Sequence, residues 1–420
     1  MFRDCTHGDV SQNIQTTTCV QPYQLGDNHQ YFSLIYLWWM EGLGTITIAS
    51  IGIIFNVTII VVVFGSDLAA HFFNWLLACL AIFDSFHLIN EILEAFRNYF
   101  GSTQLHDYIF VYFLHYFRST ILCCSEYMTV LLAVERYNAL SKPEHHILQP
   151  KEYTIPNNLT KYFSTYWKRL IKNVLPIIIL SSLLYVPKLF EARVEEEEVC
   201  GMVNTTGFID QTRSLCYCTK MFPVRETPFR NNEQYNLWYL NATNILVTVL
   251  IPVISLIYLY FNIVMKFKRH KDMYHRGLSL EFEEVTPMAT IESMLDREKT
   301  MIEQTKMLFA IVVVFIVSHT PRSILIVEEF ASIKLKEAAR EEGCVWLPYW
   351  TSIAVPISHV LLQINSSVNL LICFFFNKKF RMAHKHILRK LIVRFKFNIK
   401  RKTIQSCWQT KAQANELNCA

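Results

Sequence analysis

Long apolar stretches alternate with polar connections along most of this chain. A helix needs roughly 20 mostly apolar residues to cross the hydrocarbon core of a bilayer, and the chain offers seven such stretches. They are Leu43–Phe64, Phe72–Leu93, Phe110–Val134, Val174–Phe190, Leu240–Met265, Met307–Val327 and Trp350–Phe376. Because backbone groups inside a bilayer must be satisfied internally, the pattern predicts an all-α membrane protein built as a bundle of seven transmembrane helices.

The polar connections differ in their own patterns. Ser141–Trp167 holds three prolines and is predicted to be a loop. In Lys266–Lys306 the first part is basic and loop-like, while Ile291–Lys306 alternates charged and apolar residues and is predicted to extend the sixth helix. After the seventh stretch, Asn377–Phe397 mixes apolar positions with many lysines and arginines. That mixture predicts a short amphipathic helix on the membrane surface, with a solvated basic tail as the alternative.

Composition and charge set the orientation. Of the residues, 52% are hydrophobic and only 18% are charged, as in membrane proteins. Lysine and arginine concentrate after the third, fifth and seventh stretches, so these regions are predicted to be cytoplasmic and the N-terminus extracellular, in the plasma membrane. We expect an outer tail (1–36), a seven-helix domain (37–380) and a basic cytoplasmic tail (381–420). The net charge of +5 is explained by this topology and by membrane lipid, so no nucleic-acid partner is expected.

The cysteines agree with this topology. Six fall on the predicted outer side, where disulfides persist: Cys5, Cys19, Cys200, Cys216, Cys218 and Cys344. The Cys216–Cys218 spacing favours a disulfide or free thiol over a metal site, because no matching His/Cys pair is near. Asn204 begins an Asn-Thr-Thr motif in an outer loop and is a predicted glycosylation site. The first residues lack a cleaved signal pattern, so the first stretch is expected to serve as the signal anchor.

The triplet Glu135-Arg136-Tyr137 ends the third stretch at its cytoplasmic side. An arginine at that depth needs compensation, because a centrally buried charge costs about 2.5–3.5 kcal/mol even on the mildest scale. The adjacent Glu135 is the predicted partner. A paired arginine at the inner mouth of a bundle can change partners when the bundle opens, so the triplet predicts a conformational switch.

Charged and polar residues also occupy the outer half of the bundle, and we interpret them as a ligand site. The candidates are Glu91, Glu94, Arg118, His319, Arg322, His359 and Gln363, with Glu328 at the rim; His115 is a further polar residue of this half. Arg118 is expected to pair with Glu91 or Glu94; alternatively it contacts an anionic or amide group of the ligand. Glu126 is interpreted as a core acid near His319.

Acidic residues crowd the outer connections. Glu195–Glu198 form a run close to Glu191, and Glu328 and Glu329 border the sixth stretch. A ring of acids attracts cationic ligands. The alternative is an ordinary solvated run of charge.

Several motifs now occur in order on successive stretches. They are Asn56, Leu80-Ala81-Ile82-Phe83-Asp84, Glu135-Arg136-Tyr137, Pro252 with Tyr260, Phe315 with Pro321, and Asn365-Ser366-Ser367-Val368-Asn369. On these residues the segment Leu43–Phe380 resembles the rhodopsin-like (class A) G-protein-coupled receptors. A narrower resemblance, to invertebrate FMRFamide-type neuropeptide receptors, rests on Tyr185-Val186-Pro187-Lys188-Leu189-Phe190-Glu191, Thr227-Pro228-Phe229-Arg230-Asn231 and Ser318-His319-Thr320-Pro321-Arg322.

The resemblance implies functional roles for particular residues. A heterotrimeric G protein is expected to couple through Glu135, Arg136, Tyr137, Tyr260 and Asn369, with arrestin as a further partner. A sodium ion is implied at Asp84, Ser125, Asn365, Ser366 and Asn369; the alternative is a protonated aspartate with structural water. The chain departs from the family where Leu370 and Cys373 replace the proline and tyrosine of the seventh-helix motif, so the proline kink is expected to be missing. Val111 also replaces the usual outer cysteine of the third helix, and a bridge within the second outer loop, or to Cys5 or Cys19, is the expected substitute.

The sequence therefore predicts a receptor for an extracellular neuropeptide, an amidated FMRFamide-like peptide, acting through a G protein. The alternative is a chemosensory receptor of the same fold for small environmental molecules. A transporter or channel using Asp84, Glu126 and Arg118 as a charge relay is disfavoured, because no internal repeat is visible. No enzyme is expected, since no metalloprotease, serine-hydrolase or phosphate-loop motif appears.

Overall fold

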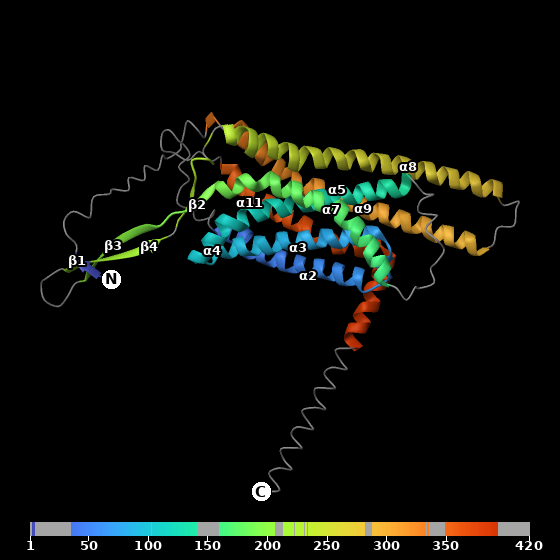
Figure 1. Cartoon of the computed structure of the whole chain (residues 1–420), viewed down its shortest axis with the longest axis horizontal. Coiled ribbons are helices and arrows are strands. Elements are labelled where there is room, and N and C mark those ends of the chain that lie inside the picture. Colours follow the sequence, from blue (N-terminus) through green and yellow to red (C-terminus); the bar gives the residue numbers. More distant parts are fainter. Residues whose placement is uncertain are drawn as a thin grey trace, which may run out of the picture.

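The computed structural model describes most of the chain. It covers residues 2–4, 35–101, 103–141, 159–205, 213–221, 223–230, 232, 234–281, 288–332, 334–335 and 349–393. Within these ranges six helices are long and apolar enough to cross a membrane, and the seventh crossing is a pair of helices with a bend between them. Figure 1 shows the long helices side by side in one bundle. The predicted seven-helix membrane fold is confirmed.

Most crossings consist of more than one helical piece. The first combines η1 (Trp38–Gly44) and α2 (Thr45–Phe64), and the second is α3 (Phe72–Tyr99). The third combines α4 (Gln104–Ile109), η3 (Phe110–Leu114) and α5 (His115–Ser141), and the fourth combines α7 (Leu159–Tyr185) and η4 (Val186–Phe190). The fifth combines η5 (Tyr235–Thr243), η6 (Ile245–Leu250) and α8 (Ile251–Glu281), and the sixth is α9 (Met288–Ala331). The seventh combines α11 (Tyr349–Ser367) and α12 (Asn369–Phe376).

Two segments predicted to be loops are helical. Helix α7 begins at Leu159, inside the predicted second inner loop, because the three prolines of that loop all precede this residue. Helix α8 continues through the basic first part of the third inner loop to Glu281. Lysine, arginine and methionine are good helix formers, so charge alone did not end the helix. The predicted inner extension of the sixth helix is confirmed, since α9 starts at Met288.

The seventh crossing is bent although its expected proline is absent. Helices α11 and α12 meet at an angle of 45°, so the predicted loss of the kink is wrong. The Ser366 carbonyl accepts a hydrogen bond from Asn56 of α2 at 2.9 Å, and the Asn369 side chain donates to Asp84 of α3 at 2.8 Å. A side chain that bonds to a carbonyl of the i→i−4 ladder can bend a helix without proline, and Asn56 does so at Ser366.

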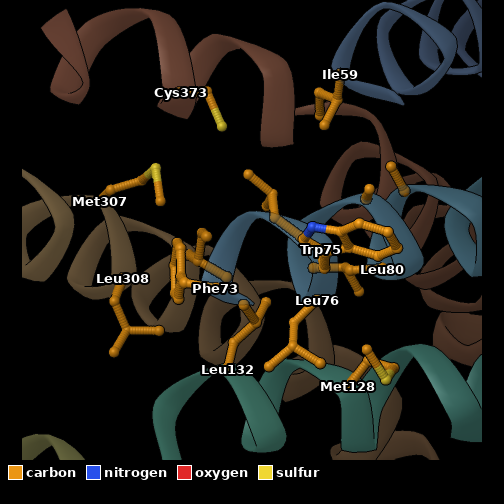
Figure 2. Packing of buried hydrophobic residues seen from close by; sticks show 14 of the residues in the cluster. Ile59, Phe73, Trp75, Leu76, Leu80, Met128, Leu132, Met307, Leu308 and Cys373 are labelled. Carbon is orange, nitrogen blue, oxygen red and sulfur yellow. The ribbon is translucent and has the colours of Figure 1, made fainter. Parts of the chain in front are cut away.

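The core lies between the inner halves of the helices. Figure 2 shows side chains of α2, α3, α5, α9 and α12 converging there, among them Leu76, Met128 and Met307. Each of these three is fully buried. Gly52 of α2 lets that helix approach α11 closely, since a Cβ at this position would lie 2.1 Å from the Ser367 hydroxyl.

Short strands cover the end of the bundle that the charge distribution predicts to face outward, which we call the outer end. Strands β2 (Ala192–Val194) and β5 (Val224–Glu226) pair antiparallel, as do β3 (Glu197–Thr205) and β4 (Arg213–Met221). Strand β1 (Phe2–Asp4) lies on the other side of β4. In Figure 1 the β3–β4 hairpin projects beyond the helices.

A helix over residues 378–393 follows the seventh crossing. Asn377 begins it, because its side chain accepts a hydrogen bond from the Phe380 backbone N–H at 3.0 Å. Phe380 and Ile387 are buried, while Lys385 between them is exposed. This pattern confirms the predicted short amphipathic helix.

Candidate functional site

Arg136 and Glu135, at the inner end of α5, do not pair with each other. Arg169 of α7 places one nitrogen 2.9 Å from both carboxylate oxygens of Glu135. The Arg136 guanidinium instead lies 3.8 Å from the centre of the Phe73 ring of α3, and its buried Nε has no hydrogen-bond partner. The predicted Glu135–Arg136 partnership is therefore wrong. Neighbouring residues on a helix point in different directions, so Glu135 faces α7 while Arg136 faces α3.

Among the described residues no contact joins Arg136 to the predicted switch residues Tyr137, Tyr260 and Asn369. Tyr137 packs its ring under Lys266 of α8, at 3.9 Å, and Lys266 also bonds to the Ser141 hydroxyl. Tyr260 stacks on Phe309 of α9 at 4.9 Å. The roles of Phe73, Arg169 and Lys266 were not predictable from the sequence, because aromatic and basic residues at helix ends have many structural uses and no spacing distinguishes these three.

Asp84 forms the centre of a buried polar cluster in the middle of the bundle. Ser125 of α5 donates to Oδ1 at 2.6 Å, and Asn369 of α12 donates to Oδ2 at 2.8 Å. The Ser366 hydroxyl lies beside this carboxylate, and the Asn56 Oδ1 atom is buried without a hydrogen-bond partner among the described residues. Asn365 is half-buried and contributes no hydrogen bond to the cluster within the described part of the chain. The structure thus brings four of the five implied sodium residues together.

These residues fit a sodium ion in chemistry. They supply hard oxygen donors around one carboxylate. Within the described ranges no group of three or more His, Cys, Asp or Glu residues could hold a metal. Any cation here would rest on a single carboxylate and neutral oxygens.

An ion-pair network fills part of the outer half. Arg118 lies 2.8 Å from Glu91 and 2.6 Å from Glu94, both on α3. Gln363 of α11 donates to Glu91 at 3.3 Å and to the Thr45 hydroxyl at 3.1 Å. Arg118 is therefore paired with two carboxylates of the protein, which confirms the predicted pairing with Glu91 or Glu94.

A second carboxylate joins this region from the first crossing. Glu41 of η1 accepts a hydrogen bond from Tyr99 at 2.6 Å and lies 3.0 Å from the His359 ring. The predicted residue His359 is thus held by an acid that the sequence analysis missed. In the sequence, Glu41 is marked only as a lone glutamate at the start of an apolar stretch.

Deeper in the bundle lie buried polar groups without partners. The Glu126 carboxylate and the His319 ring approach to 3.5 Å, and each is 2% exposed. Neither forms a hydrogen bond, and both nitrogens of the nearby His87 are equally unpaired. The expected proximity of Glu126 to His319 is confirmed. Buried polar atoms are normally satisfied, so this layer requires water or a ligand.

Two of the predicted ligand residues on α9 stand apart from the network. Arg322 is half-buried and forms no ion pair with any described residue, although its charge acts on Glu126 and His319. Glu328 lies further along α9 and is half-buried. Its backbone carbonyl accepts a hydrogen bond from the Ser332 backbone N–H.

Glu191, just beyond the fourth crossing, organises the outer loop. Its Oε2 lies 3.1 Å from His115, and its Oε1 accepts a hydrogen bond from Tyr235 at 2.7 Å. Burial alone would raise the pKa of Glu191, but the His115 contact, the charge of Lys188 and the Tyr235 hydrogen bond lower that pKa to about 2. Glu191 is therefore a structural anchor and is not free to attract a ligand.

The two outer motifs that carried the narrower resemblance dock on each other. The Thr227 backbone N–H donates to the Glu191 carbonyl at 2.9 Å, and the Thr227 hydroxyl donates to the Phe190 carbonyl at 2.5 Å. These motifs are thus explained by loop structure. Glu195 likewise pairs with Arg193 and, at 3.1 Å, with Arg225, so part of the acidic run is neutralised internally.

The predicted outer disulfides and the predicted glycosylation of Asn204 stay predictions. The four cysteines within the crossings, Cys79, Cys123, Cys124 and Cys373, are free, and three of them are buried. Cys200 and Cys218 are register partners in the β3–β4 ladder, and Asn204 is the partner of Ser214. Cys5, Cys19 and Cys344 lie outside the described residues.

Residues 44–390 match the model of a family described as serpentine type 7TM GPCR chemoreceptor Srw. The match includes nearly all seven crossings and most of the helix that follows them. A search of curated proteins found no match. The narrower resemblance to FMRFamide-type receptors gains no support from these comparisons.

Proposed function

The chain belongs to the serpentine type 7TM GPCR chemoreceptor Srw family, and from that premise we propose that it detects a small environmental molecule and activates a heterotrimeric G protein. The family match over residues 44–390 carries this proposal. The unsatisfied polar layer around Glu126 and His319 supports a ligand that enters between the helices. We further propose that the receptor resides in the plasma membrane with its N-terminus outside, and that arrestin binds its inner side.

Signalling would proceed through release of Arg136. In the arrangement described here, Arg136 rests on Phe73, and Glu135 is occupied by Arg169. An outward swing of the inner half of α9 opens the mouth of such a bundle. To reach a G protein, Arg136 would then have to leave only the face of the Phe73 ring, because it forms no ion pair with a carboxylate among the described residues.

A neuropeptide is the second candidate ligand, and one observation favours it. Strand β3 is paired on one edge by β4, and within the described residues its other edge has no partner. An extended peptide can add to such an edge by backbone hydrogen bonds. Glu329 is exposed at the same end of the molecule and would favour a cationic peptide.

The test uses cells that express the receptor with a G-protein biosensor. One panel contains volatile and water-soluble small molecules, and the other contains amidated neuropeptides. Arg136→Ala is run alongside, with surface expression measured for both proteins. We expect small molecules to trigger a signal that Arg136→Ala abolishes. A response confined to the peptides would replace the chemosensory proposal by the second candidate.

A further inference from the structure

We propose that a contact between Glu303 of α9 and the start of the helix over residues 378–393, which we call the tail helix, holds the inner end of the bundle closed. This inference rests on the proposed function, because it names what restrains the helix whose outward swing would start the signal. The restraint joins the sixth and seventh crossings and does not involve Arg136, which rests on the Phe73 ring of α3.

The contact joins a side-chain carboxylate to a backbone amide. Lys378 is the first residue of the tail helix, and its backbone N–H donates a hydrogen bond to Glu303 Oε2 at 2.9 Å. The first N–H groups of a helix have no acceptor within the helix, and the positive end of the helix dipole favours a carboxylate there. Glu303 therefore supplies from α9 an acceptor that the tail helix lacks.

Neighbouring amides of the tail helix find their acceptors locally. The Phe380 N–H donates to the Asn377 side chain at 3.0 Å, and the Arg381 N–H donates to the Asn377 carbonyl at 3.2 Å. The Asn377 N–H itself donates to the Cys373 carbonyl of α12 at 3.0 Å. The local chain satisfies these three N–H groups, whereas that of Lys378 bonds to another crossing.

The tail helix is fixed to the seventh and first crossings. The Arg381 side chain donates to the last carbonyls of α12, those of Phe374 and Phe375, at 2.6 Å and 2.9 Å. Further along, Ile387 lies against the end of α2, where a Cβ on Gly65 would come within 2.9 Å of its side chain. A displacement of α9 would therefore stretch the Glu303 contact and would not carry the tail helix along.

The inner half of α9 is packed against α12 in this arrangement. Met307 lies one turn from Glu303 on the same side of α9. Met307 and Cys373 of α12 are both fully buried, and in Figure 2 their side chains point into the same space between the two helices. The Glu303 hydrogen bond thus closes, at the inner rim, the interface that Met307 fills deeper in the bundle. An outward swing of α9 would separate both contacts.

Because the hydrogen bond uses the backbone of Lys378, one position offers a matched pair of variants. Lys378→Pro removes the N–H, and proline is tolerated at the first residue of a helix. Asn377 before it has φ −118° and ψ 102°, an extended conformation that a following proline favours. Lys378→Ala removes the same side chain but keeps the N–H, so it is the control. Glu303→Gln removes the charge of the acceptor.

The experiment measures ligand-free G-protein activation per receptor at the cell surface. We expect Glu303→Gln and Lys378→Pro each to raise it about fivefold, the scale of one exposed carboxylate contact at a helix start. Lys378→Ala should change nothing. The double variant Glu303→Gln with Lys378→Pro should signal no more than the stronger single variant, because both substitutions remove the same contact.

A second readout follows the opening directly. Spin labels replace the exposed Lys299 of α9 and Lys390 of the tail helix through non-natural amino acids, in the full-length receptor in nanodiscs. The distance between the labels should lengthen in Glu303→Gln and Lys378→Pro and stay the same in Lys378→Ala. A purely structural role of Glu303 would lower the unfolding temperature without changing this distance or the basal signal.

Unchanged basal signalling and unchanged label distances in both Glu303→Gln and Lys378→Pro would overturn the inference. A Lys378→Ala variant that behaves like Lys378→Pro would overturn it as well. The two readouts also separate the restraint from the proposed function. If small molecules activate the unaltered receptor while the variants show no basal signal, only the restraint is wrong. If the labels separate in the variants but no G protein responds to any receptor, the restraint stands and the proposed function fails.

Discussion

At the scale of single residues, the inner end shows why neighbours in sequence are poor guides to partners in space. Glu135 and Arg136 are consecutive, yet each is held by a different helix. Phe72 and Phe73 each carry one arginine on the ring face, Arg169 at 4.1 Å and Arg136 at 3.8 Å. The arginine's need for compensation could be predicted from its depth. The aromatic partner could not, because the sequence does not show which helix α5 faces at that turn.

Removing Arg169 should raise basal signalling. The Arg169→Gln variant leaves Glu135 without its partner and loosens α7 from α5, which favours the open state. Because Arg169 is partly exposed, the loss is roughly 1 kcal/mol, or about fivefold in the ratio of active to inactive receptor. Ligand-free G-protein activation per receptor at the surface measures this ratio. Lys168→Gln, which changes the exposed neighbour, is the control, and equal basal activity in both variants would contradict the assignment.

Acid should loosen the outer loop through Glu191. Its pKa in the folded receptor is about 2, below the ordinary value of 4.5. The stabilisation is therefore complete above about pH 4.5 and is lost as the pH falls toward 2. Hydrogen exchange of residues 186–194 between pH 2.5 and 6 should show faster opening in acid. Glu191→Gln should open faster at pH 6 already and lose the dependence, while Glu329→Gln should behave as the unaltered receptor.

At the scale of elements, the crossings themselves were predictable and their ends were not. Apolar length identified all seven, because the bilayer imposes that length. The inner ends of α7 and α8 were missed because water-exposed helix carries no apolar signal, and the prolines that mark a boundary lie only before Leu159. The bend between α11 and α12 was missed because it depends on Asn56 and Asp84 of other helices.

The bend predicts that a proline substitution costs much less stability at one buried leucine than at another. Leu370, 5% exposed, follows the break, and Leu362, 4% exposed, lies within α11. Leu370→Pro restores the family's proline at a position where the helix has just restarted, so its missing N–H costs little. Leu362→Pro breaks a continuous helix and should cost about 3 kcal/mol more. Thermal unfolding of the two variants measures the difference, and equal losses would show that the break plays no part.

The register of the outer hairpin predicts a disulfide. Cys200 and Cys218 are directly opposed in the β3–β4 ladder, and opposed residues of antiparallel strands have Cα atoms about 4.5–5.5 Å apart, within the range of a disulfide. Peptide mapping without reduction should find this bridge in receptor from the cell surface. Cys216, whose register partner is Met202, should remain outside it. A bridge from Cys218 to any other cysteine would contradict the prediction.

At the scale of the whole molecule, Asp84 connects the second, third and seventh crossings in one polar cluster. Its residues were predictable because the family motif gives each a position. Which of the charged candidates are already paired was not predictable, because charge counts along the chain do not show that Arg118, Glu191 and Glu195 bond within the protein.

Sodium should stabilise the receptor through this cluster. Replacing choline by sodium at constant ionic strength should raise the unfolding temperature of the unaltered receptor. The sodium ion supplies the positive charge that compensates the buried Asp84 carboxylate. Asp84→Asn should abolish the sodium effect, while Asp67→Asn, which alters an exposed aspartate, should keep it. A sodium effect of equal size in Asp84→Asn would favour the protonated aspartate with structural water.

The length of α9 has a mechanical consequence. The helix runs unbroken from Met288 to Ala331 and contains Pro321 near its outer end. With a rise of 1.5 Å per residue, the part between Met288 and Pro321 is a rod about 50 Å long. A tilt of about 10° at a pivot near the proline would carry the far tip sideways by about 9 Å. The geometry acts as a long lever with a short input arm, so a displacement of ångström size among Arg322 and its neighbours is magnified several-fold where the G protein would dock.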